Sequence, residues 1–234
     1  MPEGFRIQLS GLRGLRHSCA VLDDIKAVTL DAAGTLVEPW PSVGDVYARV
    51  AEECGIGPVT AGELNRRFGK AWKAKQGFDY SRIAWRKMVE QTFAGLAPLK
   101  PAFFDHLYEE FAQPGCWRVY EDVAPALESF RARGLKLAVI SNWDERLRPM
   151  LTQMGLAPYF EAIVISAELR IHKPDRAIFE HAANALQTSP GKIMHVGDSR
   201  EEDFEGARVA GFQAVLLERD KPTAAVSSLA DLID

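Results

Sequence analysis

The stretch Ala27-Val-Thr-Leu-Asp31-Ala-Ala-Gly-Thr-Leu36 joins a short apolar run to a carboxylate, a glycine and a hydroxyl. The later stretch His195-Val-Gly-Asp-Ser199 repeats this order, with an apolar run that ends in an aspartate. Short runs of Val, Ile, Leu or Ala bounded by polar residues are typical of buried parallel strands. Each stretch therefore predicts a buried strand that presents a carboxylate at its carboxyl end.

Three further apolar runs follow the same pattern, which gives five predicted strands, at residues 25–30, 135–140, 162–166, 193–196 and 213–217. Predicted helices fill the gaps, at about residues 123–133, 144–154, 175–186 and 200–210. Gly134, Gly155 and Gly211 stand where the C-terminal caps of helices are expected. Alternating strands and helices predict an α/β core built as a doubly wound parallel sheet.

One connection in this pattern is unusually long, because about a hundred residues separate the first two predicted strands. Within it, apolar residues recur at helical spacing, as at Leu64, Phe68 and Trp72. The pattern predicts an inserted helical cap, with hinges near residues 38–41 and 114–116. The expected domains are an N-terminal extension at 1–24, the core at 25–39 and 115–234, and the cap at 40–114.

The chain has 234 residues and a net charge of −4. Nucleic-acid-binding domains are usually basic, so this charge argues against a nucleic-acid partner. No apolar run approaches the roughly 18 residues of a membrane span. The three cysteines show neither metal-ligand spacing nor a paired framework. We therefore expect a cytoplasmic protein, a monomer or homodimer, that binds neither nucleic acid nor membrane.

Polar residues at the predicted strand ends match the needs of phosphoryl transfer. Asp31 is the candidate nucleophile, because a carboxylate can attack phosphorus and form an aspartyl-phosphate. Thr35, Ser141 and Asn142 can donate hydrogen bonds to anionic oxygens. Lys173 would neutralise the nucleophile and the transferring group. Each residue alone is more often a turn, a cap or a surface residue, so the prediction rests on their joint order along the chain.

Acidic residues after the fourth predicted strand predict a metal site. In an open α/β sheet the carboxyl ends of the strands meet at one edge, where ligands bind. Carboxylate oxygens are ligands that Mg²⁺ prefers. We expect Asp31 and Asp198 to bind Mg²⁺, with the backbone carbonyl of Ala33 as a third ligand. Asp203 is expected to support them, whereas the two glutamates before it are explained as favourable charges in a first helical turn.

Four motifs make the chain resemble the haloacid dehalogenase-like (HAD) hydrolase superfamily: Asp31-Ala-Ala-Gly-Thr-Leu36, Ser141-Asn142, Lys173-Pro174 and Gly197-Asp-Ser-Arg-Glu-Glu-Asp203. The resemblance covers about residues 25–220. The helical insert resembles the type-one cap of subfamily I, and the chain is most similar to the rhythmically-expressed-gene-2-like branch. The resemblance implies a Rossmann-like core with strand order 5-4-1-2-3, Mg²⁺ as cofactor, and hydrolysis of a small phosphorylated metabolite through an aspartyl intermediate.

Ala33 departs from the phosphatases of this superfamily, which have an aspartate there to protonate the leaving alcohol and then activate water. Roughly 10²–10⁴-fold of acid–base catalysis is therefore expected to be missing. Substrates with good leaving groups, such as acyl phosphates, would suffer least. Two alternatives stay open. One is a hydrolase that resembles phosphonoacetaldehyde hydrolase or 2-haloacid dehalogenase, and the other is a catalytically weakened protein that acts by binding.

The predicted cap contains a basic segment. Residues 66–87 include eight lysines or arginines and a single acid, Asp79. If this segment faces the active site, it favours a small anionic substrate, and otherwise it is a solvated surface. Lys70 and Lys73 are the candidates for the Schiff-base lysine of the phosphonoacetaldehyde alternative. The aromatic residues of the cap are expected to form its core rather than a substrate pocket.

Overall fold

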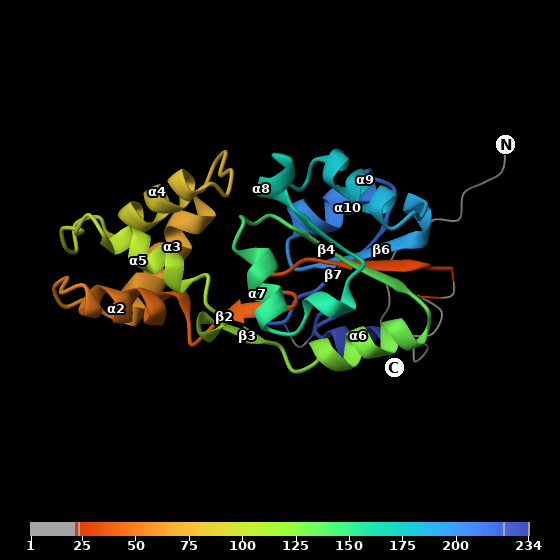
Figure 1. The fold of residues 1–234 in the computed structure, drawn as a ribbon, viewed down its shortest axis with the longest axis horizontal. Coiled ribbons are helices and arrows are strands. Elements are labelled where there is room, and N and C mark those ends of the chain that lie inside the picture. Colours follow the sequence, from red (N-terminus) through yellow and green to blue (C-terminus); the bar gives the residue numbers. More distant parts are fainter. Residues whose placement is uncertain (1–21, 23, 222, 234) are drawn as a thin grey trace.

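The computed structural model describes residues 22, 24–221 and 223–233. The extension predicted for residues 1–24 therefore lies almost entirely outside the described residues. The described part consists of a lobe built on a sheet and a lobe built of helices (Figure 1). Within it, no helix is long and apolar enough to cross a membrane.

A parallel sheet of five strands forms the core of the first lobe. Its strands lie in the order β5 (Ala162–Ile165), β4 (Lys136–Ser141), β1 (Ala27–Leu30), β6 (Ile193–Gly197) and β7 (Gln213–Leu216). Numbered within this sheet alone, the order is 3-2-1-4-5, which is the predicted 5-4-1-2-3 read from the opposite edge. The α/β prediction is confirmed, because the apolar runs form short parallel strands whose central members are buried.

Helices cover both faces of this sheet. Helices α6 (Val123–Ala132) and α7 (Leu147–Gln153) pack on one face, and α9 (Arg176–Ala185) and α10 (Gly206–Val209) pack on the other. Shorter elements complete the lobe: α8 (Ser166–Leu169), η3 (Ala157–Tyr159), η4 (Pro190–Lys192) and η6 (Leu229–Leu232). The helix predicted over residues 200–210 begins instead as a π-helix, η5 (Arg200–Glu205), which leads into α10. Single π-helical turns are frequent at functional sites.

Four helices form the second lobe: α2 (Val43–Glu53), α3 (Ala61–Lys73), α4 (Arg82–Phe93) and α5 (Phe103–Glu110). They surround a hydrophobic cluster of their own that includes Leu64, Phe93 and Phe103. Strands β2 (Val37–Pro39) and β3 (Trp117–Val119) pair antiparallel where the chain leaves and re-enters the sheet lobe, next to the short η2 (Pro114–Cys116). We call α2 to α5 with their connecting loops the helical lobe.

Gly44 allows α2 to approach α3 closely. A Cβ at this position would lie 2.2 Å from the carbonyl oxygen of Ala61 and 2.7 Å from Cγ of Asn65. The backbone N–H of Gly44 donates to Oδ1 of Asn65 at 2.7 Å, and Nδ2 of Asn65 donates to Oγ of Ser42 at 2.7 Å. Since Ser42 also caps α2, Asn65 joins the start of α2 to α3.

We predict that Gly44→Ala destabilises the protein by about 1–3 kcal/mol, because the added methyl group forces α2 and α3 apart. Gly69→Ala is the matched control, since a Cβ at Gly69 in α3 meets nothing within 4 Å. That substitution should stabilise the helix by roughly 0.5–1 kcal/mol. Denaturant unfolding of both variants measures the difference, and equal unfolding free energies would contradict this account of the packing.

Candidate active site

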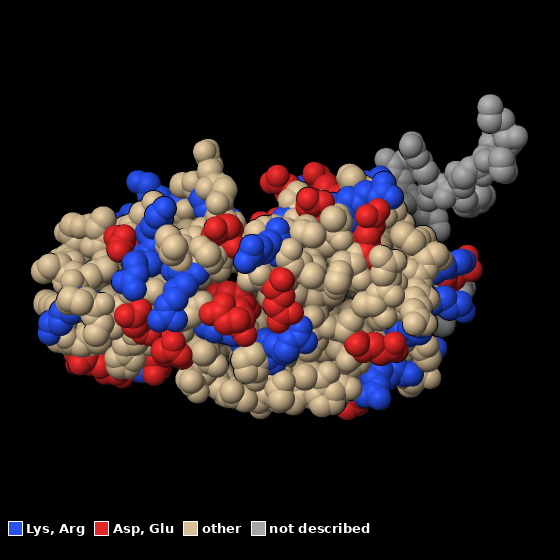
Figure 2. Space-filling model, turned by 45° about the horizontal axis from the view of Figure 1, so that its top comes forward, with Lys and Arg blue, Asp and Glu red and all other residues tan. Residues whose placement is uncertain are grey.

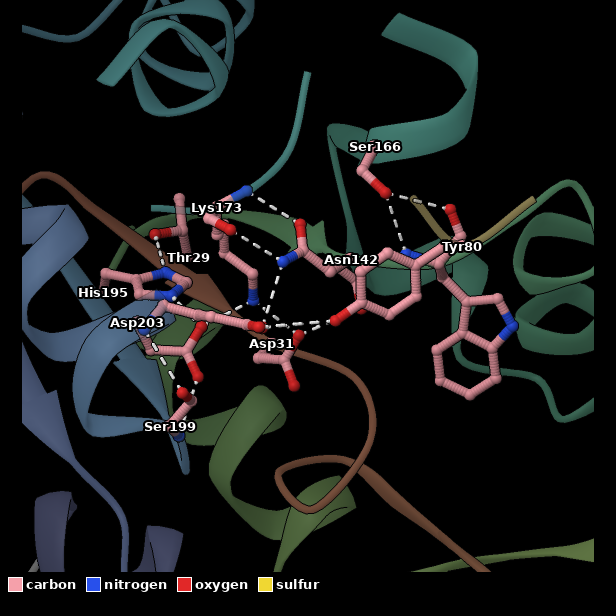
Figure 3. Close-up of polar contacts among 12 residues, drawn as sticks. Thr29, Asp31, Tyr80, Asn142, Ser166, Lys173, His195, Ser199 and Asp203 are labelled. Carbon is pink, nitrogen blue, oxygen red and sulfur yellow. Dashed lines mark hydrogen bonds and ion pairs between the residues drawn. The ribbon is translucent and has the colours of Figure 1, made fainter. Parts of the chain in front are cut away.

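Three of the residues predicted for the site stand at the carboxyl ends of neighbouring strands. Asp31 follows β1, Ser141 is the last residue of β4, and Asp198 follows β6. Because β1 lies between β4 and β6, these side chains meet at one edge of the sheet. Lys173 reaches the same edge from the loop before α9 (Figure 3). The structure thus brings together residues that lie far apart in the sequence.

Lys173 is the buried centre of this edge, with only 3% of its surface exposed. Its Nζ donates to Oδ1 of Asp31 at 2.7 Å and to Oδ1 of Asp203 at 2.5 Å. Burial alone would lower the pKa of Lys173, but the two carboxylates outweigh it and raise that pKa. The lysine is therefore a fixed positive charge that touches the candidate nucleophile.

Asp203 is held by protein donors on both of its oxygens. Its Oδ1 accepts from Lys173 and lies 3.1 Å from Nε2 of His195, and its Oδ2 accepts from the backbone N–H of Ser199 at 2.9 Å. Burial would raise the pKa of Asp203, but Lys173 and His195 lower it overall. Since an ionised Asp203 only accepts, Nε2 of His195 donates to it, and Nδ1 of His195 lies 2.9 Å from the hydroxyl of Thr29.

Ser141 and Asn142 act on the two partners of this ion pair. The hydroxyl of Ser141 donates to Oδ1 of Asp31 at 2.9 Å. Nδ2 of Asn142 donates to the backbone carbonyl of Lys173 at 2.9 Å, and Oδ1 of Asn142 accepts from the backbone N–H of Lys173 at 2.8 Å. Ser141 therefore orients the candidate nucleophile, and Asn142 fixes the loop that delivers the lysine.

The three aspartates form a cluster that could hold a cation. Oxygens of Asp31, Asp198 and Asp203 lie within 4.8 Å of one another. Burial raises the pKa of Asp31, partly opposed by Lys173. Asp198 is open to the cavity, but partial desolvation by the walls of the cleft, together with repulsion from Asp31 and Asp203, raises its pKa to about 7. Negative charge at this edge thus exceeds what Lys173 neutralises, and a divalent cation would remove the excess.

Two glycines make room for the aspartates. Gly34 has a φ of +79°, which a residue with a Cβ rarely adopts, and a Cβ there would lie 2.5 Å from Oδ2 of Asp198. A Cβ at Gly197 would lie 2.2 Å from Cγ of Asp203. The backbone at Gly34 and at Gly197 therefore leaves space for the neighbouring carboxylates.

Ala33 and Thr35 take different places in the loop after β1. Ala33 is exposed and lines the cavity above Asp31, so its methyl group occupies a position that faces the site. Thr35 is fully buried outside that lining, and its Oγ1 has no hydrogen-bond partner among the described residues. Contact between Thr35 and an anionic oxygen stays a prediction.

A cavity of about 590 Å³ opens above this edge, between the sheet lobe and the helical lobe. Its floor includes Asp31 and Asp198, and its roof includes the aromatic side chains of Phe68, Trp72 and Trp85. These residues belong to the aromatic group that was expected to form only the core of the cap. They line the cavity and also pack on one another, because Trp72 stacks on both Phe68 and Trp85.

Most of the basic segment faces away from this cavity. Arg66 and Arg67 pair with Glu63, and Arg82 pairs with Asp105 and Glu109 on the surface. Figure 2 shows that basic and acidic side chains alternate on the surface of this lobe. Of the eight basic residues of the segment, Lys73 and Lys75 line the cavity. The segment is therefore chiefly a solvated surface with two lysines at the site.

Sequence reasoning missed several polar residues of the cavity, among them Lys75, Tyr80 and Glu202. Nζ of Lys75 lies 3.1 Å from the hydroxyl of Tyr80 and 3.5 Å from Oε1 of Glu202, so the helical lobe touches the sheet lobe here. No spacing signal marks the first two, because both lie in the loop between α3 and α4. Glu202 was expected only to complement a helix terminus.

Comparisons with known proteins agree with these motifs. The model of the haloacid dehalogenase-like hydrolase family matches residues 25–211. Haloacid dehalogenase-like hydrolase domain-containing protein 3 of Bos taurus is 34% identical, over 85% of this chain and 84% of that protein. The rhythmically expressed gene 2 protein of Drosophila melanogaster is 26% identical, over 84% of each chain.

Two relatives are described as phosphatases. A phosphoserine phosphatase of Thermus thermophilus is 38% identical, over 83% of this chain and 89% of that protein. A crystal structure of a HAD phosphatase from Thermococcus onnurineus superposes with a TM-score of 0.66 at 25% identity, over 89% of this chain and 96% of that one. The match of motifs, fold and sequence over most of the chain shows that this protein belongs to the haloacid dehalogenase-like hydrolases, and its similarity to the rhythmically expressed gene 2 protein agrees with the predicted branch.

Proposed function

We propose that the protein hydrolyses a small anionic phosphorylated metabolite through an aspartyl-phosphate on Asp31. The observation that supports this most strongly is the set of contacts of the Asp31 carboxylate. Among the described residues, Ser141 and Lys173 both donate to Oδ1, and Asp31 itself lines the cavity. The carboxylate is thus oriented by two donors and faces open space, as an attacking oxygen must.

Mg²⁺ is the cofactor that the cluster fits best, since the available donors are carboxylate oxygens. Asp31 and Asp198 would hold the ion, with the backbone carbonyl of Ala33 as a third protein ligand. Asp203 would support these ligands without binding the ion directly, because both of its oxygens already accept hydrogen bonds from protein donors. When bound, the ion would neutralise negative charge on the transferring phosphoryl group.

The remaining residues have separate roles in this proposal. Lys173 offsets the charge of Asp31 and of the phosphoryl oxygens in a site where water is largely excluded. Ser141 would turn its hydroxyl from Asp31 to a phosphoryl oxygen, and Asn142 would donate to another phosphoryl oxygen in place of Glu202. Thr35 would donate its hydroxyl to an anionic oxygen, since its Oγ1 has no other partner among the described residues. The second step is hydrolysis of the aspartyl-phosphate by water, which returns Asp31 and releases phosphate.

The cavity indicates what the substrate resembles. Its aromatic roof fits an apolar or aromatic group next to the phosphate, and Lys73 and Lys75 fit an additional negative charge. Ala33 favours leaving groups that need little protonation. Of the two candidate Schiff-base lysines of the phosphonoacetaldehyde alternative, Lys73 lines the cavity and Lys70 does not, so this alternative keeps one candidate lysine. The acidic cluster supports a metal-dependent hydrolase more than the metal-free dehalogenase or the pure binding alternative.

Replacing Asp31 with asparagine should abolish Mg²⁺-dependent phosphate release from acetyl phosphate, a loss of roughly 10³-fold or more, because the amide cannot form the intermediate. Glu201→Gln is the control, since Glu201 lines the same cavity but is exposed. Steady-state phosphate release measures both variants. Equal activity of the asparagine variant and the wild type would rule out Asp31 as the nucleophile.

Ala33→Asp should raise hydrolysis of an alkyl phosphate relative to that of acetyl phosphate, by up to about 10²–10⁴-fold, because it supplies an acid and base beside Asp31. Acetyl phosphate serves as the internal control, since its leaving group needs little protonation. The ratio of the two rates, measured for wild type and variant, gives the result. An unchanged ratio would mean that the side chain at this position does not reach the leaving group.

Mg²⁺ should raise the melting temperature more at pH 8 than at pH 6. The raised pKa of Asp198, about 7, leaves this group mostly protonated at pH 6, so a proton must be displaced before a cation binds. Without metal, the folded protein binds the proton of Asp198 more tightly than the unfolded chain does. The contribution of Asp198 to the free energy of unfolding is therefore lost as the pH rises through about 7. Thermal melts with and without Mg²⁺ test this, with Asp198→Asn as the variant that should lose the shift. Equal Mg²⁺-induced shifts of the melting temperature at both pH values would contradict this prediction.

A further inference from the structure

Tyr80 occupies a constrained position in the roof of the cavity. It lies in the loop between α3 and α4, is 5% exposed, and has a φ of +58°. A bulky residue in this left-handed region is uncommon, and such strain is often found at functional sites. Its ring packs against His172 of the sheet lobe, with 5.8 Å between centroids, while Nε2 of His172 lies 2.9 Å from the backbone carbonyl of Asp79. The loop is thus docked beside Lys173.

The hydroxyl of Tyr80 points from the helical lobe toward the edge that bears Asp31 (Figure 3). It lies 3.4 Å and 3.5 Å from the two carboxylate oxygens of Glu202, and 3.1 Å from Nζ of Lys75. Glu202 is itself held by Nδ2 of Asn142 at 3.0 Å. Hydrogen bonds between oxygens are usually 2.5–3.0 Å long, so the phenolic proton is only loosely engaged by Glu202.

This geometry meets the chemical need that Ala33 creates. When Asp31 attacks phosphorus, the oxygen of an alcohol leaving group needs a proton, and the methyl group of Ala33 has none to give. Tyr80 lines the same cavity as Asp31 and Ala33 but belongs to the helical lobe, whose aromatic side chains we proposed as the contacts of the organic part of the substrate. Its hydroxyl is both a donor and, once ionised, an acceptor.

We propose that Tyr80 is a catalytic residue that replaces the missing acid and base, an inference that rests on the proposed phosphatase function. In the first step, Asp31 bonds to phosphorus, the bond from phosphorus to the leaving oxygen breaks, and the phenolic proton passes to that oxygen. In the second step, the phenolate accepts a proton from the attacking water. Phosphate leaves, and Asp31 and the phenol are restored.

Lys75 and Glu202 are positioning residues in this scheme. The ammonium group of Lys75 is held 3.6 Å from the centroid of the Trp72 ring, and from there it stabilises the phenolate that forms. Burial and the charge of Glu202 raise the pKa of Tyr80 in the resting protein, so the phenol keeps its proton until the leaving oxygen becomes basic. Lys75 thus acts through Tyr80, and Lys75→Met should reproduce part of the loss caused by Tyr80→Phe.

The test compares Tyr80→Phe with Tyr108→Phe. The phenylalanine at position 80 keeps the ring contacts and removes only the hydroxyl. Tyr108 is the matched control, because it lines the same cavity and its hydroxyl also joins the two lobes, donating to Oε1 of Glu145 at 3.0 Å. The substrates are acetyl phosphate, aryl phosphates of graded leaving-group basicity and an alkyl phosphate, and kcat/KM is measured with Mg²⁺ present.

We expect Tyr80→Phe to lose about 10²–10⁴-fold on the alkyl phosphate and to stay within a few-fold of wild type on acetyl phosphate. The loss in kcat/KM should grow steadily with leaving-group basicity, whereas Tyr108→Phe should change kcat/KM by the same factor for all substrates. Ala33→Asp should restore the alkyl phosphate activity of the Tyr80→Phe variant by a larger factor than it adds to the wild type.

A loss of the same size on every substrate would overturn the inference, since it would assign Tyr80 to holding the lobes together. That result leaves the proposed function intact, because acetyl phosphate is still hydrolysed by the wild type and not by Asp31→Asn. Absence of wild-type activity on acetyl phosphate and on every ester would instead overturn the proposed function and this inference with it.

Discussion

The structure of the active-site edge depends on one buried charge, the ammonium group of Lys173. A buried ammonium is costly unless it is paired and hydrogen-bonded, and here Asp31 and Asp203 meet both needs. The three residues come from the loop before α9, the end of β1 and the π-helix after β6. Removal of Lys173 would leave the buried carboxylates of Asp31 and Asp203 without a compensating charge. The same contacts that hold these elements together therefore also fix the candidate nucleophile.

The two lobes contribute different parts of the candidate site. The sheet lobe supplies charge and orientation through residues at strand ends, which the buried sheet holds rigidly. The helical lobe supplies the aromatic roof and meets the sheet lobe through a few polar contacts, such as Tyr108 with Glu145 and His172 with the carbonyl of Asp79. In the proposed function, the helical lobe would select the substrate and the sheet lobe would attack its phosphoryl group.

The sheet and its acidic edge could be predicted from the sequence, because buried parallel strands leave continuous apolar runs and because Asp31 and Asp198 directly follow two of them. Lys75 and Tyr80 could not be predicted, because they lie in a loop without periodicity and reach the site only through the docking of one lobe on the other. The outward direction of the basic segment was equally hidden, since it depends on partners such as Glu63 and Asp105. A helical pattern does not distinguish an α-helix from the π-helix that carries Asp203 toward Lys173.

The proposed reaction transfers a phosphoryl group to the carboxylate of Asp31. The most direct measurement is acid quenching of the protein during turnover of radiolabelled acetyl phosphate with Mg²⁺, followed by digestion and mapping of the label. If Asp31 forms an aspartyl-phosphate, the peptide that contains Asp31 should have an acid-stable, hydroxylamine-labile label, and no such label should form without Mg²⁺. Phosphate release without any label on that peptide, or a label on a different residue, would contradict it.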